Sequence, residues 1–158
     1  MASTVGPVIT ELKLQLTIDC AEPERLAAFW AAALGYRVEP PPAPFATWRA
    51  YWLEQGLSEE ELGAGDCSDS VIDPDGVGPR IWFQQVPEPK VVKNRLHLDL
   101  GVSGGRGIPF ATRKERVLAA VALLETAGAS RLRVEDSEGS GSFFVVMEDP
   151  EGNEFCVH

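Results

Sequence analysis

The chain has 158 residues, of which 44% are hydrophobic and 24% charged, as expected for one globular domain. Its formal net charge of −10 opposes binding to nucleic-acid phosphates or to an anionic membrane surface, so we expect neither as a partner. Membrane-spanning runs and a secretory signal pattern are missing, and the three cysteines lack the CxxC spacing of a structural zinc site. We therefore expect a cytoplasmic protein.

The first half of the chain, about residues 11–87, predicts a strand, a helix and then further strands. Apolar and polar residues alternate from Leu12 to Cys20, which is typical of a half-buried strand. Pro23 suits the first turn of a helix and Gly35 suits its end. Two short helices are expected within residues 45–63. The remaining predicted strands are Tyr36–Glu39, Cys67–Ile72 and Arg80–Val86.

The second half, residues 94–158, repeats this order after a proline-containing linker at 87–93. Its predicted elements are a strand at Asn94–Val102, a helix at Arg113–Ala127, and strands at Arg131–Glu135, Phe143–Glu148 and Glu154–His158. A DPxG turn precedes the final strand of each half, at 73–76 and at 149–152. The matching order indicates an internal duplication within a single α+β domain.

Side chains alternate between the two faces of a strand, so each predicted strand divides into an apolar and a polar set. The apolar set, including Leu14, Phe83 and Leu96, is expected to form the core, and Leu96→Ala to cost roughly 2–5 kcal/mol. A strongly curved sheet would make the polar face a cup for a small molecule, although a merely solvated sheet face has the same pattern. The candidate ligand-binding residues are Gln15, Thr17, Trp82, Gln84, His97, Asp99, Cys156 and, from the short helices, Trp52.

The runs LQLTIDCAEPERLAAFWAAALGYRVE, NRLHLDL and DPEGNEFCV resemble the glyoxalase-like branch of the vicinal oxygen chelate superfamily, which includes bleomycin-resistance proteins and extradiol dioxygenases. The resemblance implies two βαβββ modules forming a curved mixed sheet around a cup, with helices on the outer face. It places metal ligands of the metal-dependent members at Gln15, Gln84, His97 and Cys156. Among these, only His97 is of the usual type, because Gln15 stands for a histidine and Cys156 for a glutamate. We therefore expect no metal cofactor, His97 and Cys156 being the only plausible ligands of a divalent ion.

Two functions remain open from the sequence. The favoured one is binding or sequestration of a small, partly aromatic compound by a cup with a degenerate metal site. The alternative is a lyase, isomerase or dioxygenase in which His97 acts as metal ligand or base. A third hypothesis is that the cup is vestigial and the protein acts through an interface. The sequence also leaves open whether the modules close one cup within the chain or across a homodimer.

Overall fold

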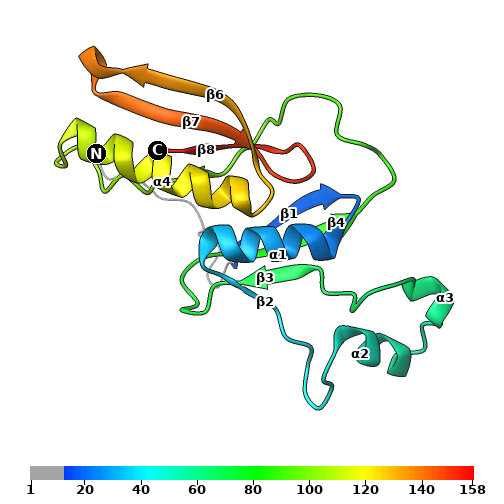
Figure 1. Ribbon diagram of the computed structural model, residues 1–158. Helices are drawn as coiled ribbons and strands as arrows, with labels where there is room; N and C mark the ends of the chain where they lie inside the picture. The colour runs from blue at the N-terminus through cyan, green and yellow to red at the C-terminus, as the bar shows by residue number, and fades with distance from the viewer. Residues whose placement is uncertain (1–12) are drawn as a thin grey trace, which may run out of the picture.

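The computed structural model describes residues 13–158, which form two βαβββ modules (Figure 1). The first module contains β1 (Gln15–Cys20), α1 (Pro23–Leu34), β2 (Arg37–Val38), α2 (Trp48–Glu54), α3 (Glu59–Leu62), β3 (Ser70–Ile72) and β4 (Arg80–Gln85). The second contains β5 (Asp99–Leu100), α4 (Phe110–Thr126), β6 (Ser130–Ser137), a 3₁₀ turn (Glu138–Ser140), β7 (Ser142–Glu148) and β8 (Glu154–Val157). Among the described residues, no helix is both long and apolar enough to cross a membrane.

Each module builds its own four-stranded sheet, and the two sheets have the same topology. The strand orders are β1-β4-β3-β2 and β5-β8-β7-β6. The first and last strands of each module pair in parallel, whereas the other pairs are antiparallel. The α+β fold class and the paired modules predicted from the sequence are thus confirmed, with open sheets in place of one continuous sheet.

One face of each sheet is covered by the helix of its module. Helix α1 begins with a proline and ends at Gly35, whose φ of 67° is a left-handed C-cap. Its buried residues Leu26, Phe29 and Trp30 belong to the same core as Ile81 and Phe83 of β4. Helix α4 buries Val117, Val121 and Leu124 in the second module. The opposite, polar face of each sheet has no covering helix in Figure 1 among the described residues.

The modules are joined through α1 and the turn before β8. The Trp30 indole Nε1 donates to Asp149 Oδ2 at 3.1 Å, and its ring lies 5.2 Å from that of Phe155. Glu151 accepts from the backbone amides of Ala21 and Glu22 at 2.7 and 2.6 Å. The second DPxG turn therefore anchors the start of the first module's helix.

The prediction that Leu96 and Leu14 lie in the core was wrong. Leu96 is 86% exposed and Leu14 62% exposed, because neither lies on a paired strand beneath a helix. The expected strand Asn94–Val102 shrinks to Asp99–Leu100, since the preceding residues continue the arching linker in Figure 1. Alternation alone cannot tell a strand from an extended loop that lacks a partner.

The other predicted strand and helix boundaries differ less from those of the structure. The strand expected at Cys67–Ile72 begins only at Ser70, because Cys67 adopts a positive φ of 63° that extended backbone excludes. Helix α4 begins at Phe110 rather than Arg113, directly after Pro109. The predicted start of the first strand, at Leu12, lies outside the described residues.

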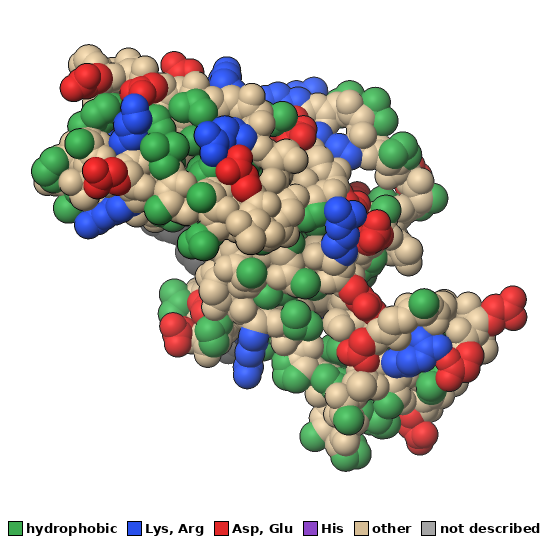
Figure 2. Space-filling model, viewed as in Figure 1, with side chains coloured by type: hydrophobic (Ala, Val, Ile, Leu, Met, Phe, Trp, Pro, Cys, Tyr) green, Lys and Arg blue, Asp and Glu red, His purple; other side chains and the backbone are tan. Residues whose placement is uncertain are grey.

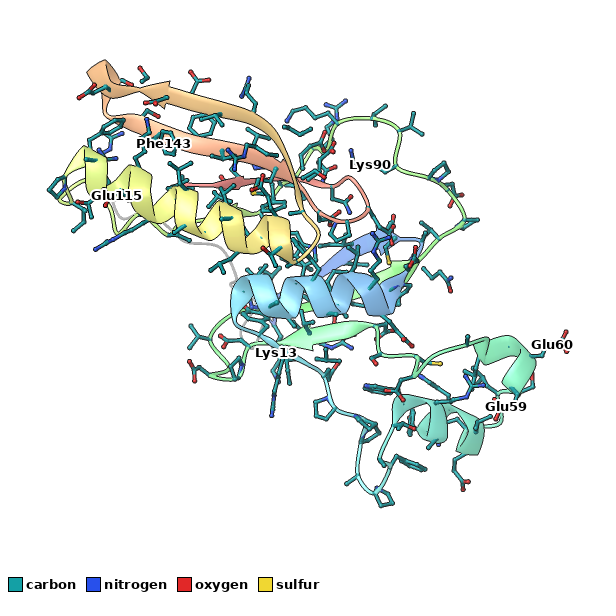
Figure 3. All side chains as sticks on the ribbon, viewed as in Figure 1. Lys13, Glu59, Glu60, Lys90, Glu115 and Phe143 are labelled. Carbon is teal, nitrogen blue, oxygen red and sulfur yellow. The ribbon has the colours of Figure 1, made fainter. Side chains whose placement is uncertain are left out.

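The two short helices predicted within residues 45–63 are confirmed as α2 and α3. The Thr47 side chain caps α2 by accepting from the Ala50 amide, and Ser58 with Glu61 forms a capping box on α3. Figure 2 shows this insert as a lobe beside the main body, and Figure 3 places Glu59 and Glu60 at its outer end. The insert brings several aromatic residues to the edge of the first sheet.

Candidate ligand-binding site

Two tryptophans from different elements line the same two pockets beside the open face of the first sheet. Trp82 lies on β4 and Trp52 on α2, and both line two neighbouring pockets together with Asp69. The pockets measure about 900 and 590 Å³. The Trp82 Nε1 donates to Asp69 Oδ2 at 2.7 Å, which fixes the plane of the indole. We call Trp52, Trp82 and Asp69 the tryptophan site.

The rest of that face is a hydrogen-bonded network centred on Arg80. Its guanidinium contacts Glu39 Oε2 at 2.6 Å, Gln15 Oε1 at 2.8 Å and the buried Ser70 hydroxyl at 2.7 Å. The Trp48 indole donates to the Glu39 carbonyl oxygen at 2.7 Å and stacks on Trp52. These contacts hold the insert and its aromatic side chains against the sheet.

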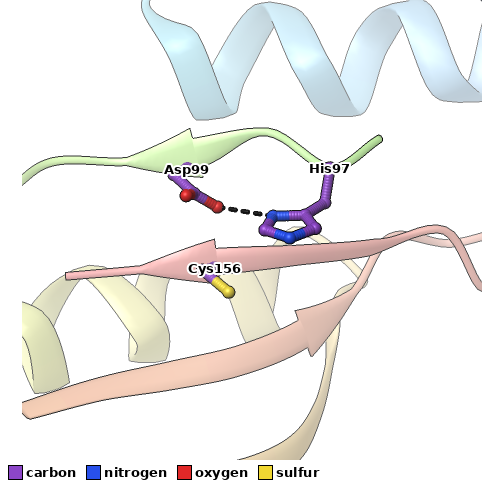
Figure 4. A group of neighbouring side chains, drawn as sticks. All are labelled: His97, Asp99 and Cys156. Carbon is purple, nitrogen blue, oxygen red and sulfur yellow. Dashed lines mark hydrogen bonds and ion pairs between the residues drawn. The ribbon is translucent and has the colours of Figure 1, made fainter. Parts of the chain in front are cut away.

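A second cluster lies on the open face of the second sheet and consists of His97, Asp99 and Cys156 (Figure 4). The His97 Nδ1 lies 2.7 Å from Asp99 Oδ1, and the candidate donor atoms of the three residues all lie within 4.8 Å of one another. Asp99 and Cys156 are paired residues of the parallel strands β5 and β8. We call these three residues the His97 cluster.

The Cys156 thiol is poorly placed for ionisation. Burial raises its pKa, and the charge of Asp99 together with a hydrogen bond to that carboxylate raises it further, against a lowering by Lys93 and Arg133. Because a thiolate is the reactive and metal-binding form, Cys156 is a neutral group near pH 7 rather than a nucleophile.

The sequence profile of the glyoxalase-like domain matches residues 15–158. The chain belongs to this family. It is a member of the glyoxalase-like branch of the vicinal oxygen chelate superfamily, as the resemblance implied. No curated protein matches the chain.

Solved structures of this superfamily share the fold at low sequence identity. A glyoxalase/bleomycin resistance protein/dioxygenase family enzyme from Burkholderia phytofirmans is 17% identical, covers 90% of this chain and 94% of its own, and has a TM-score of 0.54. The fosfomycin resistance protein FosX from Mesorhizobium loti is 10% identical over 96% of this chain and 92% of its own, with a TM-score of 0.54. A FosX mutant from Listeria monocytogenes, solved with Mn(II), is 10% identical over 96% and 90%, with a TM-score of 0.55.

Because some members of the superfamily depend on a metal, we compared the side chains of this glyoxalase-like chain with those that a metal site needs. The His97 cluster offers one imidazole, one carboxylate and one thiol. Because Asp99 bonds to Nδ1 of His97, Nε2 is the ring nitrogen left to ligate a metal. Asp99 therefore orients the ring instead of completing a ligand set. The remaining thiol has a raised pKa. The cluster therefore fits a resident catalytic metal poorly within one chain.

The structure divides the predicted binding residues of the glyoxalase-like chain into three groups. Trp52 and Trp82 share their pockets with Gln84 on one side and with Gln15 on the other. Thr17 and His97 line a pocket of about 710 Å³ beneath the linker, and Asp99 and Cys156 line another of about 450 Å³. Of the four positions expected to converge, His97 and Cys156 lie together in the His97 cluster, whereas Gln15 and Gln84 border two other pockets.

Sequence reasoning missed the acidic and basic partners at these pockets. Asp69, which orients Trp82, lies just before β3, and nothing in the sequence links it to a tryptophan thirteen residues later. Arg106 and Arg113 border the same pocket as Cys156. The alternation of side chains along β4 was a usable signal that Arg80 lies on the polar face of the sheet, where the structure places it.

Proposed function

We propose that this glyoxalase-like protein binds or sequesters a small, partly aromatic compound at the tryptophan site. The observation that carries the proposal is the pair Trp52 and Trp82, which line two adjoining pockets on a sheet face free of any covering helix in the described chain. A flat ligand stacked on an indole gains typically ~1 kcal/mol beyond buried area. Asp69 and Gln84 supply the polar contacts that orient such a ligand.

The fixed side chains of the tryptophan site support binding rather than a passive solvated face. Trp82 is held by Asp69, and Arg80 is held by three partners. Within the described chain, no buried side-chain nitrogen or oxygen lacks a hydrogen-bond partner. A preorganised wall lowers the entropy lost when the ligand binds.

The test is a thermal-shift and tryptophan-fluorescence screen with small heteroaromatic compounds, followed by variants. Trp82→Ala should weaken any hit about tenfold while leaving the fold intact, because Trp82 faces the open side of the sheet. Trp82→Phe keeps a flat ring but loses the bond to Asp69, so its effect should be smaller. Leu123→Ala, at an exposed position on α4, is the control and should bind normally. Equal affinity in Trp82→Ala and the native chain would contradict the proposal.

A second candidate function is favoured by the His97–Asp99 contact of 2.7 Å. A carboxylate on Nδ1 leaves Nε2 as an acceptor, which suits a general base in a lyase, isomerase or dioxygenase. The solved relatives with enzymatic names make such activity a reasonable alternative. Turnover that is lost in His97→Gln but kept in Trp82→Ala would favour this function over simple binding.

We also propose that a second copy of the chain completes the site. Apart from Thr17 and His97, which share one pocket, the cup residues of the two modules border separate pockets in one chain, and a second protomer would bring both polar faces to one cup. Exposed Val91, Val92 and Leu96 on the linker give the apolar surface that such an interface would cover. Light scattering after size exclusion should give the mass of a homodimer. A monomer would contradict closure across two chains and leave binding at the tryptophan site standing.

A further inference from the structure

The pocket beside Asp99 and Cys156 is built from three parts of the second module. Its walls are the glycine-rich loop after β5, the start of α4, and the adjoining ends of β7 and β8. It measures about 450 Å³, enough for a small organic molecule. Its lining residues are Asp99, Ser103, Gly105, Arg106, Arg113, Gly141, Ser142, Phe143, Phe144, Cys156 and His158.

The charge of this lining differs from that of the rest of the molecule. The chain carries a net charge of −10, and acidic side chains outnumber arginines and lysines in the other three pockets described above. Here Arg106 and Arg113 face a single carboxylate, Asp99, which is already engaged with His97. An anion approaching the protein is therefore repelled by most of its surface and attracted to this pocket.

Arginines also fix the shape of the loop. Arg116 donates to the Ser103 carbonyl at 3.1 Å, and Arg113 donates to the carbonyls of Ile108 at 3.1 Å and Gly141 at 2.9 Å. Gly104 and Gly105 adopt positive φ values of 85° and 89°, and a Cβ on Gly104 would overlap the Arg116 guanidinium. The glycines are thus required by the loop's conformation, and its carbonyls are held by the protein.

The hydrogen-bond donors of the glycine-rich loop are available to a ligand. Among the described residues, the amides of 104–107 have no backbone or side-chain acceptor, and the exposed Arg106 side chain has no ion-pair partner. Ser103 and Ser142 add hydroxyl groups to the pocket lining. Phe144, half-buried on the face that also carries Cys156, offers an apolar surface for the remainder of a ligand.

We propose that this pocket binds the oxyanion group of a small organic anion, a carboxylate or a phosphonate, between Arg106, Arg113 and the glycine-rich loop. The apolar part of the ligand then lies on Phe144 beside the His97 cluster. Charged hydrogen bonds from guanidinium and amide donors are the interactions that proteins use for such groups. The inference goes beyond the proposed function, because it assigns a different pocket and a different ligand chemistry.

The test is an NMR titration of the full chain with phenylphosphonate, benzoate and neutral benzyl alcohol at constant ionic strength. Both anions should shift the amide signals of residues 104–107, and benzyl alcohol should not. Arg106→Gln should weaken anion binding about tenfold, because it removes a charged donor from an exposed position without disturbing the core. Arg95→Gln is the matched control, since it makes the same charge change at the pocket beneath the linker, and its affinity should stay within about twofold.

The outcomes separate this inference from the proposed function. Loop signals that stay unchanged with both anions, or equal losses in Arg106→Gln and Arg95→Gln, would overturn the anion pocket. Shifts with only one of the two anions would support it and select between carboxylate and phosphonate. Anion binding without any neutral aromatic hit at Trp82 would leave this inference standing and remove the proposed function, whereas the reverse result would remove this inference alone.

Discussion

Asp99 sits between two groups whose chemistry it controls in opposite ways. It holds the His97 ring by Nδ1 at 2.7 Å, which leaves Nε2 free to accept a proton. The same carboxylate raises the pKa of the Cys156 thiol, after the larger effect of burial. One acidic residue therefore orients the histidine ring and adds to the raised pKa of the neighbouring cysteine.

Replacement of Asp99 should make Cys156 more reactive. In Asp99→Asn the negative charge that opposes thiolate formation is gone, so the pKa of Cys156 falls and its alkylation by iodoacetamide starts at lower pH. The rate at Cys156 is followed by mass spectrometry, which separates it from Cys67 and from Cys20, whose pKa burial raises to about 12. Asp75→Asn is the control for charge at an exposed turn. A pH profile of Cys156 unchanged by Asp99→Asn would refute the coupling.

Leu26 and Leu96 should differ sharply in their contribution to stability. Leu26→Ala empties a fully buried position of α1 and should lower the free energy of unfolding by roughly 2–5 kcal/mol. Leu96→Ala removes a side chain that is 86% exposed, so its effect should stay within about 0.5 kcal/mol. Urea denaturation curves of both variants measure the difference. A large loss in Leu96→Ala would mean that the linker is covered in solution, as in the proposed dimer.

At the scale of elements, the two DPxG turns have the same sequence pattern and different contacts. In the second turn, Glu151 accepts from the Ala21 and Glu22 amides at the start of α1. The N-cap residue of α1 makes no capping hydrogen bond with its own side chain. In the first turn, the Asp75 side chain at the matching position makes no hydrogen bond within the described residues, and only its amide bonds to Asp73. The second turn is thus a link between modules, while the first is a local turn.

Substitution of these two residues should separate the two roles. Glu151→Ala removes a carboxylate that accepts two amides near a positive helix end, and should cost about 1 kcal/mol. Asp75→Ala changes the same charge in the matching turn and should stay within about 0.5 kcal/mol. Thermal or urea unfolding measures both, and Glu151→Gln should recover part of the loss. Equal costs at the two positions would show that Glu151 does not cap α1.

Strong local signals made the elements predictable, and the lack of local signals made the site only partly so. Pro23 and Gly35 marked helix ends that the structure reproduces, and Ser58 with Glu61 forms an equally local capping box. Leu96 was misplaced because alternation does not reveal whether a strand finds a partner. The hydrogen bond of Trp82 to Asp69 and the pocket shared by Trp52 and Trp82 depend on how the insert folds back onto the sheet, which no periodicity encodes.

At the scale of the whole molecule, the placement of the two polar faces decides which chemistry one chain performs alone. Gln15 and Gln84 belong to the first sheet, and His97 and Cys156 to the second module. His97 and Cys156 lie together in the His97 cluster, whereas Gln15 and Gln84 border other pockets, so only half of the ligand set that the resemblance implies is brought together in the described chain. Closing the faces in a dimer would add two glutamine amides, which are weak ligands for transition metals.

Purified protein should therefore contain far less than one transition-metal ion per chain by elemental analysis, and EDTA should leave its melting temperature nearly unchanged. Any metal that binds only the native state would raise that temperature by mass action, so added Zn²⁺ or Mn²⁺ gives the complementary measurement. Gln15→His and Cys156→Glu together restore the ligand types usual at those positions, and in the proposed dimer this double variant should gain a metal-dependent increase in melting temperature. His97→Ala in that background should abolish the gain. Stoichiometric metal in the native chain, lost in His97→Ala, would overturn the argument and favour the enzymatic alternative.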